Sequence, residues 1–228
     1  MTDTSFGPGS YRWKTATPAE YVRRDEELLS KGERAVRVEV LATGALSVGV
    51  SQRDDAACVV RARRRGIPIV RRSTGGLALW HAPGDIAWSL VLPRSDPRVG
   101  NDFSKAYGRL GAGVVQLLRD FGISAAWTAP AGPVTEYCLL SGRGDVLTVE
   151  GRAVGGAAQH LTRKALLHHG VLSYRLDLSR LRELFDLSPV LLERSLTCLE
   201  MVAGGVAPEE WARRLEDILV SQADPRRR

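Results

Sequence analysis

The stretch from Arg71 to Leu92 constrains the fold more than any other part of the chain. It places two glycines, Gly75 and Gly76, between a pair of arginines and an apolar run that begins at Ile86. Glycine lets a ligand or another backbone approach the main chain, and strand glycines often mark such places. Because residues 86–92 are mostly apolar, they predict a buried strand that holds the glycine turn rigidly. The alternative is an ordinary hairpin with solvated arginines, because short glycine motifs also match by chance.

The same stretch carries polar groups that suit an anion. Arg71 and Arg72 stand directly before the turn, and the forked guanidinium group grips carboxylate or phosphate. Ser73 and Thr74 add hydroxyl groups, and His81 adds an imidazole that can serve as a base or a hydrogen-bond donor. The stretch is therefore interpreted as a strand pair that binds an anionic ligand.

Length and composition indicate one domain. The 228 residues, 44% of them hydrophobic, can fill a substantial core. The N-terminus lacks the apolar segment of a signal peptide and no apolar run is long enough to span a bilayer, so we expect a soluble, cytoplasmic protein without a membrane partner. We expect a flexible arm over residues 1–16, one domain over 17–220 and a disordered basic tail over 221–228.

Charge points to acidic partners. The net charge is +6 and the isoelectric point is about 9.6, which favours binding to nucleic acid or to an acidic protein domain. Only four of the 32 basic residues are lysine, and the arginines are spread along the chain instead of forming one arm. This dispersal argues against nucleic acid.

The order of predicted elements is mixed. Thr17, Pro18 and Glu20 form a helix start with a capping box, and Asp54 or Asp55 is expected to cap the next helix. The predicted helices span residues 18–30, 54–65, 102–121, 178–187 and 208–219, and the predicted strands span 35–41, 45–50, 86–92, 146–149, 152–154 and 161–172. Residues 123–144 are predicted to be mostly loop. Hairpins beside helices favour an α+β fold with a mixed, largely antiparallel sheet flanked by helices.

A second glycine-bearing stretch runs from Gly151 to Gln159, about eighty residues after the first. If the two strands are neighbours in the sheet, the two stretches line one cleft that suits a phosphate or an acyl chain. Neither stretch contains the P-loop pattern or the dinucleotide-binding pattern, so nucleotide binding of those kinds has little support.

Cys138 is the candidate nucleophile, since a nearby cation can activate a thiol. Its neighbours Tyr137 and Leu139 equally suit a small buried apolar residue. The three cysteines are widely separated without metal-binding spacing, and no Cys-His cluster occurs, so neither a disulfide framework nor a metal site is predicted.

Taken together, the motifs resemble those of the lipoate-protein ligase and octanoyltransferase family. Residues 71–81 are similar to its RRxSGGGAVYH-like stretch, residues 153–159 to its Lys-Ile-x-Gly-Ser-Ala-Gln stretch, and residues 167–170 to its Leu-x-His-Gly. The strands at 46–52 and 84–90 agree, and the resemblance covers about residues 17 to 220. It implies a fold like the catalytic domain of biotin-protein ligases.

The resemblance also implies a reaction, the attachment of lipoyl or octanoyl groups to a lysine of an acidic lipoyl carrier domain. Transferases of the family take octanoyl from acyl carrier protein through a cysteine thioester and need no cofactor, and Cys138 falls where one transferase branch has this cysteine. Ligases use ATP and Mg²⁺ to form the acyl-adenylate. The resemblance assigns substrate binding to Arg71, Arg72, Ser73, Thr74, Gly75, Gly76, Leu77, His81, Ala153, Gly155, Gly156, Ala157, Gln159, His168, His169 and Gly170.

Three residues depart from the family pattern. Ala153 replaces the lysine that contacts the acyl carbonyl or phosphate oxygens, Ala157 replaces a serine, and Leu77 replaces a third glycine and is expected to narrow the pocket. Loss of one oxyanion donor costs on the order of a hundredfold in rate. Arg152 points to the opposite face of its strand, so Lys164 is the candidate replacement cation. Three hypotheses follow: an acyltransferase acting through Cys138, an ATP-dependent ligase, and a catalytically impaired relative that binds an acyl chain or a carrier.

Overall fold

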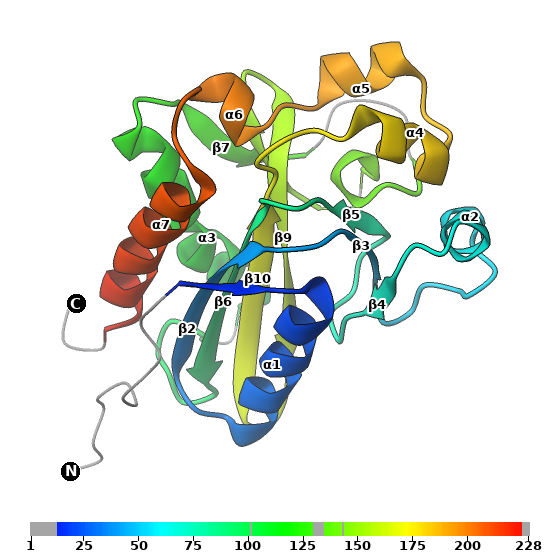
Figure 1. Cartoon of the computed structure of the whole chain (residues 1–228). Helices are drawn as coiled ribbons and strands as arrows, with labels where there is room; N and C mark the ends of the chain where they lie inside the picture. The colour runs from blue at the N-terminus through cyan, green and yellow to red at the C-terminus, as the bar shows by residue number, and fades with distance from the viewer. Residues whose placement is uncertain (1–12, 101, 130–134, 143, 225–228) are drawn as a thin grey trace.

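A seven-stranded sheet runs through the centre of the computed structural model, which describes residues 13–100, 102–129, 135–142 and 144–224 (Figure 1). Its strands lie in the order β1 (Lys14–Ala16), β2 (Ala35–Leu41), β6 (Ile86–Pro93), β10 (Ala165–Leu172), β9 (Arg152–Leu161), β8 (Val146–Val149) and β7 (Ala125–Thr128). Only β1 and β2 pair in parallel; the other neighbours are antiparallel. The prediction of a mixed, largely antiparallel sheet is confirmed.

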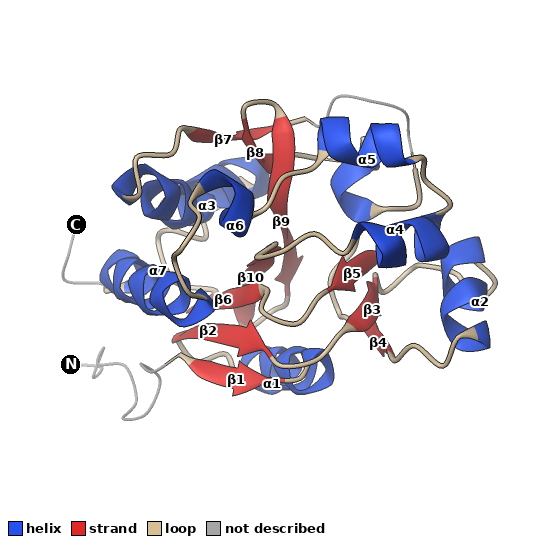
Figure 2. Ribbon diagram, turned by 45° about the horizontal axis from the view of Figure 1, so that its top comes forward, coloured by secondary structure: helices blue, strands red, loops and turns tan. Residues whose placement is uncertain are grey.

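Helices cover both faces of this sheet (Figure 2). The helices α3 (Phe103–Asp120) and α7 (Pro208–Ala223) share a core with Ile86, Trp88 and Leu90 of β6. The alternate residue Ala87 packs in a second cluster, which includes Tyr21 and Val22 of α1 (Pro18–Lys31). Burial on both faces explains why β6 is apolar at every position except Ser89.

A second sheet stands beside the first, with the strand order β4 (Ile69–Arg71), β3 (Ala45–Val48) and β5 (Leu79–His81). Its core joins Leu46 and Val48 to residues of α2 (Ala57–Arg64) and α4 (Leu178–Phe185). The short elements η1 (Cys138–Leu140), α5 (Pro189–Ser195) and α6 (Leu199–Val202) complete the chain. The sheets bring the two glycine-bearing stretches together from opposite sides.

The capping box of α1 is present as predicted, because the Thr17 hydroxyl accepts the N–H of Glu20 and the Glu20 carboxylate accepts the N–H of Thr17. The predicted cap of α2 is wrong. That helix begins at Ala57, and its N-cap residue, Ala56, has no side chain that could cap it. Asp54 pairs with arginines instead, and Asp55 pairs with Arg53, so each carboxylate is held by a guanidinium.

The predicted interruption at Gly155 and Gly156 is also wrong, since β9 continues through both residues. A Cβ atom on Gly155 would collide with the carbonyl oxygen of Val171 on β10, so glycine here permits close strand approach and does not break the strand. The 123–144 region, predicted as mostly loop, contains β7 and η1.

The predicted ends of the domain need adjustment. Residues 14–16 pair with β2 and so are not part of a flexible arm, and α7 continues to Ala223, into the stretch predicted as tail. Residues 1–12 and 225–228 lie outside the described residues. Within the described ranges, no helix is both long enough and apolar enough to cross a membrane.

Candidate functional site

A pocket lies between the small sheet and strands β9 and β10 of the large sheet. It encloses about 600 Å³ of space outside protein atoms, part of it open to solvent. Its polar lining includes Ser47, Arg72, His81, Cys138, Asp145 and His169. Its apolar lining includes Val22, Leu79, Leu139, Val146 and Val171. The two glycine-bearing stretches therefore meet at one cleft, although their strands face each other from different sheets and are not neighbours as predicted.

Arg72 is a buried cation in the wall of this pocket, 7% exposed. Its guanidinium donates to the Ser47 hydroxyl (3.1 Å) and to the carbonyl oxygens of Gly75 (2.9 Å) and Leu77 (2.8 Å). No carboxylate among the described residues lies within ion-pair distance. Burial lowers the pKa of Arg72, and a negative charge on the Cys138 sulfur would counteract this lowering. A guanidinium in this setting suits an anion or a developing oxyanion.

The neighbouring Arg71 has a different role. Its guanidinium donates to the carbonyl oxygens of Gly49 (2.9 Å) and Gln52 (2.8 Å) and to the Asp54 carboxylate (2.7 Å). Successive side chains of a strand point to opposite faces, which explains why only one of the two arginines reaches the pocket. Arg71 does not line this pocket; its side chain holds residues 49–54 in place, and its contact with a ligand stays a prediction.

Cys138 is held at the pocket by the segment around it. Its backbone N–H donates to the carbonyl oxygen of Ala78 (2.7 Å), and the Ser141 hydroxyl donates to the Cys138 carbonyl oxygen (2.9 Å). The glycine turn approaches the thiol closely, since a Cβ atom built on Gly76 would lie 3.5 Å from Cys138 Sγ and 2.8 Å from Arg72 Nη2. The thiol and the guanidinium thus converge on one turn.

The adjacent His168 and His169 occupy opposite faces of β10. His169 lines the pocket, and its ring nitrogens contact Asp25 (2.8 Å) and Thr74 (2.9 Å). His168 lies in the core, where its ring contacts Trp88 and its Nδ1 accepts from Gln159 (3.0 Å). Burial lowers the pKa of His168 to about 3. His168 and Gln159 therefore bond to each other and do not line the pocket that was predicted to hold the ligand.

His81 lines the pocket beside Arg72. Burial lowers the pKa of His81 to about 3, and the positive charge of Arg72 adds to this lowering. His81 is therefore neutral at physiological pH. Its Nδ1 is buried and has no hydrogen-bond partner among the residues that the structure describes.

Lys164 does not reach the pocket. It lies in the turn between β9 and β10, and its ammonium group donates to the carbonyl oxygen of Ser30 (3.0 Å). Five strand positions separate it from His169, which is about 16 Å at the usual rise and farther than a lysine side chain extends. The prediction of Lys164 as the replacement cation is wrong. Ala153 is buried beside Leu139, Val146 and Leu196, so no cation stands at that position either.

The structure brings together seven of the predicted residues in the pocket lining: Arg72, His81, Cys138, Gly156, Ala157, His169 and Gly170. The other predicted site residues, which do not line it, are Arg71, Ser73, Thr74, Gly75, Gly76, Leu77, Ala153, Gly155, Gln159, His168 and Lys164. Leu77 contributes its carbonyl oxygen to Arg72 and does not narrow the pocket as expected.

Sequence reasoning missed the contribution of α1. Tyr21 and Val22 line the pocket, and Asp25, which is 1% exposed, holds His169. Tyr21 and Asp25 are four residues apart and so share one face of the helix. An acidic residue at a core-facing helical position is the signal that could have identified Asp25, because carboxylates are rarely buried without a partner.

Residues 27–217 match the family described as "Lipoyl protein ligase A/B catalytic domain". Octanoyltransferase LipM of an Exiguobacterium species is 30% identical over 181 residues, covering 73% of this chain and 65% of that protein. Octanoyltransferase LipM of Bacillus subtilis is 28% identical over 185 residues, covering 75% of this chain and 66% of that protein. The chain thus spans just under two thirds of the length of these relatives.

Solved structures share the fold. Lipoate-protein ligase A bound with ATP has a TM-score of 0.73 at 20% identity, with 93% of this chain and 85% of that chain covered. A bipartite lipoate protein ligase from Thermoplasma acidophilum, solved in a study that includes its E2 lipoyl domain, has a TM-score of 0.72 at 17% identity, with 93% and 83% covered. At this identity the likeness concerns the arrangement of helices and strands.

Proposed function

Because the chain belongs to the lipoyl protein ligase A/B catalytic domain family, we propose that it is an acyltransferase that moves an octanoyl or lipoyl group onto a lysine of a lipoyl carrier domain through a thioester on Cys138. One observation carries the proposal: the Cys138 thiol and the Arg72 guanidinium converge on the glycine turn of an otherwise mostly apolar pocket. The curated relatives named octanoyltransferase support octanoyl as the group transferred.

The reaction proceeds in two steps. The Cys138 thiolate attacks the carbonyl carbon of an acyl thioester, a C–S bond forms to Cys138, and the donor thiol leaves with the proton that Cys138 lost. The carrier lysine amine then attacks the new thioester, an amide C–N bond forms, and the C–S bond to Cys138 breaks. The amine proton finally returns to the sulfur.

Arg72 stabilises the oxyanion of both steps. A guanidinium has five N–H donors, and three of its hydrogen bonds go to described residues, so donors remain for the substrate. The side chains of Leu79, Leu139 and Val146 cover the acyl chain. A fixed cation in a buried site supports a developing negative charge more effectively than it would in water.

The partners and the location of this reaction are part of the proposal. The donor is acyl carrier protein, and the acceptor is an acidic lipoyl carrier domain, which the net charge of +6 attracts. The transfer requires no cofactor, and the setting is cytoplasmic without a membrane or nucleic-acid partner.

A second candidate rests on Ala153. The family's lysine is absent there and Lys164 does not replace it, which favours a catalytically impaired relative that binds an acyl chain or a carrier. The ligase hypothesis requires ATP and Mg²⁺ and free acid as substrate. The three hypotheses predict different reactants. The acyltransferase acylates the carrier from octanoyl-acyl carrier protein, the ligase does so from free acid with ATP and Mg²⁺, and the impaired relative does not acylate it.

The test incubates the full chain with octanoyl-acyl carrier protein and a lipoyl domain, and follows both proteins by mass spectrometry. We expect an octanoyl adduct on Cys138 and an octanoylated lysine on the lipoyl domain. Cys138→Ala should abolish both products, and Cys198→Ala, at a buried cysteine outside the pocket, should retain them.

Two other results would replace the proposal. Octanoylation that needs octanoate, ATP and Mg²⁺ would identify a ligase. Binding of octanoyl-acyl carrier protein without an adduct on Cys138 would identify an impaired relative.

A further inference from the structure

A buried chain of polar side chains connects α1 to the glycine turn. His169 Nδ1 lies 2.8 Å from Asp25 Oδ2, and His169 Nε2 lies 2.9 Å from the Thr74 hydroxyl. All three residues are nearly inaccessible, with exposed fractions of 1% for Asp25, 5% for His169 and 0% for Thr74. The order carboxylate, imidazole, hydroxyl is that of a catalytic proton-transfer chain, and His169 belongs to the pocket wall.

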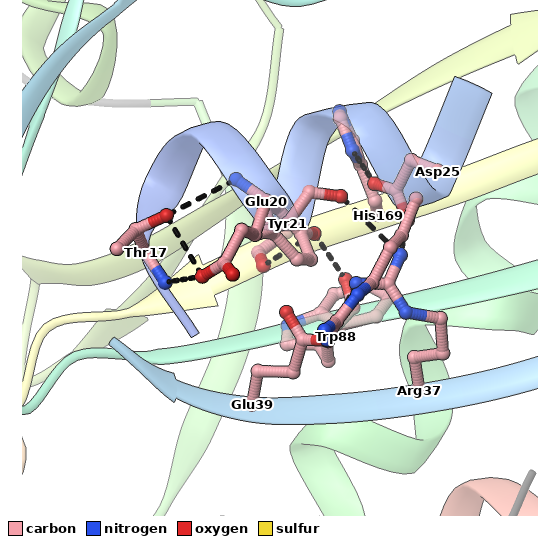
Figure 3. Close-up of polar contacts among 10 residues, drawn as sticks. Thr17, Glu20, Tyr21, Asp25, Arg37, Glu39, Trp88 and His169 are labelled. Carbon is pink, nitrogen blue, oxygen red and sulfur yellow. Dashed lines mark hydrogen bonds and ion pairs between the residues drawn. The ribbon is translucent and has the colours of Figure 1, made fainter. Parts of the chain in front are cut away.

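The charge of Asp25 is compensated on its other oxygen. Arg37 Nη1 lies 2.6 Å from Asp25 Oδ1, and Arg37 Nη2 lies 2.6 Å from Glu39 (Figure 3). A carboxylate can only accept hydrogen bonds, so His169 carries its proton on Nδ1 when the ring is neutral. His169 Nε2 then accepts from the Thr74 hydroxyl and is the basic nitrogen of the ring.

The orientation of the ring is also fixed. Tyr21 stacks on His169 with ring centroids 6.0 Å apart, and the Tyr21 hydroxyl donates to the carbonyl oxygen of Trp88 (2.7 Å). Figure 3 shows Tyr21 and Asp25 on the same helix, both facing the strand that carries His169. A carboxylate and a stacked ring together leave the imidazole one orientation, as a proton-transferring histidine requires.

We propose that His169 is the general base and general acid of the transfer step, in a site where the family's lysine is absent. This inference rests on the proposed function. As the carrier lysine amine attacks the Cys138 thioester, His169 Nε2 takes the amine proton while the Thr74 hydroxyl turns away. The resulting imidazolium is stabilised by Asp25. The imidazolium returns the proton to the Cys138 sulfur as the C–S bond breaks, so Asp25 and Thr74 act as positioning residues.

The other pocket histidine does not suit this role. The pKa of His81 is lowered to about 3, whereas an effective base has a pKa near the working pH. The ionisable groups around His169 are Asp25 and Tyr21 from α1, His81 from β5, the adjacent His168, and Arg37 of β2, which acts through Asp25. Arg72 and Cys138 line the same pocket. Among these, only Asp25 places a negative charge directly on the ring.

The test separates the two half-reactions by rapid quench, with thioester formation on Cys138 and transfer to the lipoyl domain measured as functions of pH. For His169→Gln we expect transfer to slow by about 10²- to 10⁴-fold, with loss of the acidic limb of its pH profile. Asp25→Asn should shift that limb, and Thr74→Ser should retain activity better than Thr74→Val. His160→Gln, at a histidine outside the pocket lining, is the matched control.

The outcomes distinguish failure of the proposed function from failure of the role assigned to His169. A parent protein that forms no thioester would overturn the proposed function together with this inference. A parent protein that forms the thioester, with transfer rate and pH profile unchanged in His169→Gln, would overturn the role of His169 alone. Nitrogen NMR of the parent protein gives a check that needs no variant: we expect the neutral His169 ring protonated on Nδ1, and protonation on Nε2 would contradict the inference.

Discussion

The carboxylate of Glu136 accepts a hydrogen bond from the backbone N–H of Cys58, with 3.2 Å between nitrogen and oxygen. Cys58 lies in the first turn of α2, where the N-cap residue Ala56 offers no side-chain acceptor. Glu136 stands two residues before Cys138. A side chain distant in sequence thus caps α2 and, by the same bond, fastens the segment that carries the thiol.

Removal of this bond should affect both stability and activity. We expect Glu136→Ala to lower the free energy of unfolding by about 1 kcal/mol, as loss of a helix cap does, and to slow acylation of Cys138. Glu136→Gln keeps an acceptor oxygen and should be affected less. Urea unfolding and the rate of thioester formation measure the two effects, and an alanine variant with full activity would show that the segment is held by its other bonds.

Substitution at Gly76 should disturb the site directly. Gly76 has a φ of 94°, and a Cβ atom there would lie 2.8 Å from Arg72 Nη2. We expect Gly76→Ala to lose about 1–2 kcal/mol of stability from the left-handed backbone, and more activity than this loss explains, because the guanidinium must move. Gly75→Ala is the control, since a Cβ atom on Gly75 has no neighbour within 4 Å. Equal transfer rates in the two variants would contradict this account of the turn.

Restoration of the family's lysine at Ala153 should lower the stability of the protein. Ala153 is 2% exposed and packs with Leu139, Val146 and Leu196. A long side chain overfills the space at about 1–3 kcal/mol, and a buried ammonium without a partner adds to this cost. We expect Ala153→Lys to have a lower melting temperature than Ala153→Met, because methionine has a long side chain without a charge. A stable lysine variant with strongly increased transfer would instead favour the impaired-relative hypothesis.

Asp96 should make the stability of the protein depend on pH in the acidic range. Its carboxylate pairs with Arg34 (2.6 Å) and Arg98 (2.7 Å). Burial alone would raise the pKa of Asp96, but the hydrogen bonds from Arg98 and Arg34 outweigh burial and lower it from 3.8 to about 2. Because the folded pKa lies below the unfolded value, this stabilisation is present above about pH 4 and is lost as the pH falls toward 2.

We therefore expect Asp96→Asn to cost about 2 kcal/mol at pH 7 and much less at pH 2, measured by urea unfolding at each pH. The exposed Asp217, whose side chain is 70% accessible, provides the control. Asp217→Asn should change stability by less than about 1 kcal/mol at either pH. An equal cost of Asp96→Asn at both pH values would contradict the ionic origin of the effect.

Local pattern alone predicted several elements correctly. The capping box at Thr17, the apolar run from Ile86 and the helical stripe of α3 each depend on residues close in sequence, so neighbouring side chains suffice to determine them. The resemblance to the lipoate-protein ligase and octanoyltransferase family is likewise confirmed, since its motifs stand in order along the chain.

Pattern failed where a partner comes from another element. Asp54 looks like a helix cap but pairs with Arg71, seventeen residues later. Lys164 looks available but bonds to Ser30 of α1. In each case the competing interaction joins segments that only the fold brings together: an ion pair for Asp54 and a bond to a backbone carbonyl for Lys164.

The sequence by itself determined that this chain has a glycine-bearing turn with arginines, a histidine pair and a cysteine, in the order typical of one family. Only the tertiary structure decided which of these groups share a pocket. Strand pairing sets which face each side chain occupies, so Arg72 and His169 face the pocket while their neighbours Arg71 and His168 do not. Packing across the sheets sets the register between strands that are distant in sequence, and this register cannot be read from the sequence alone.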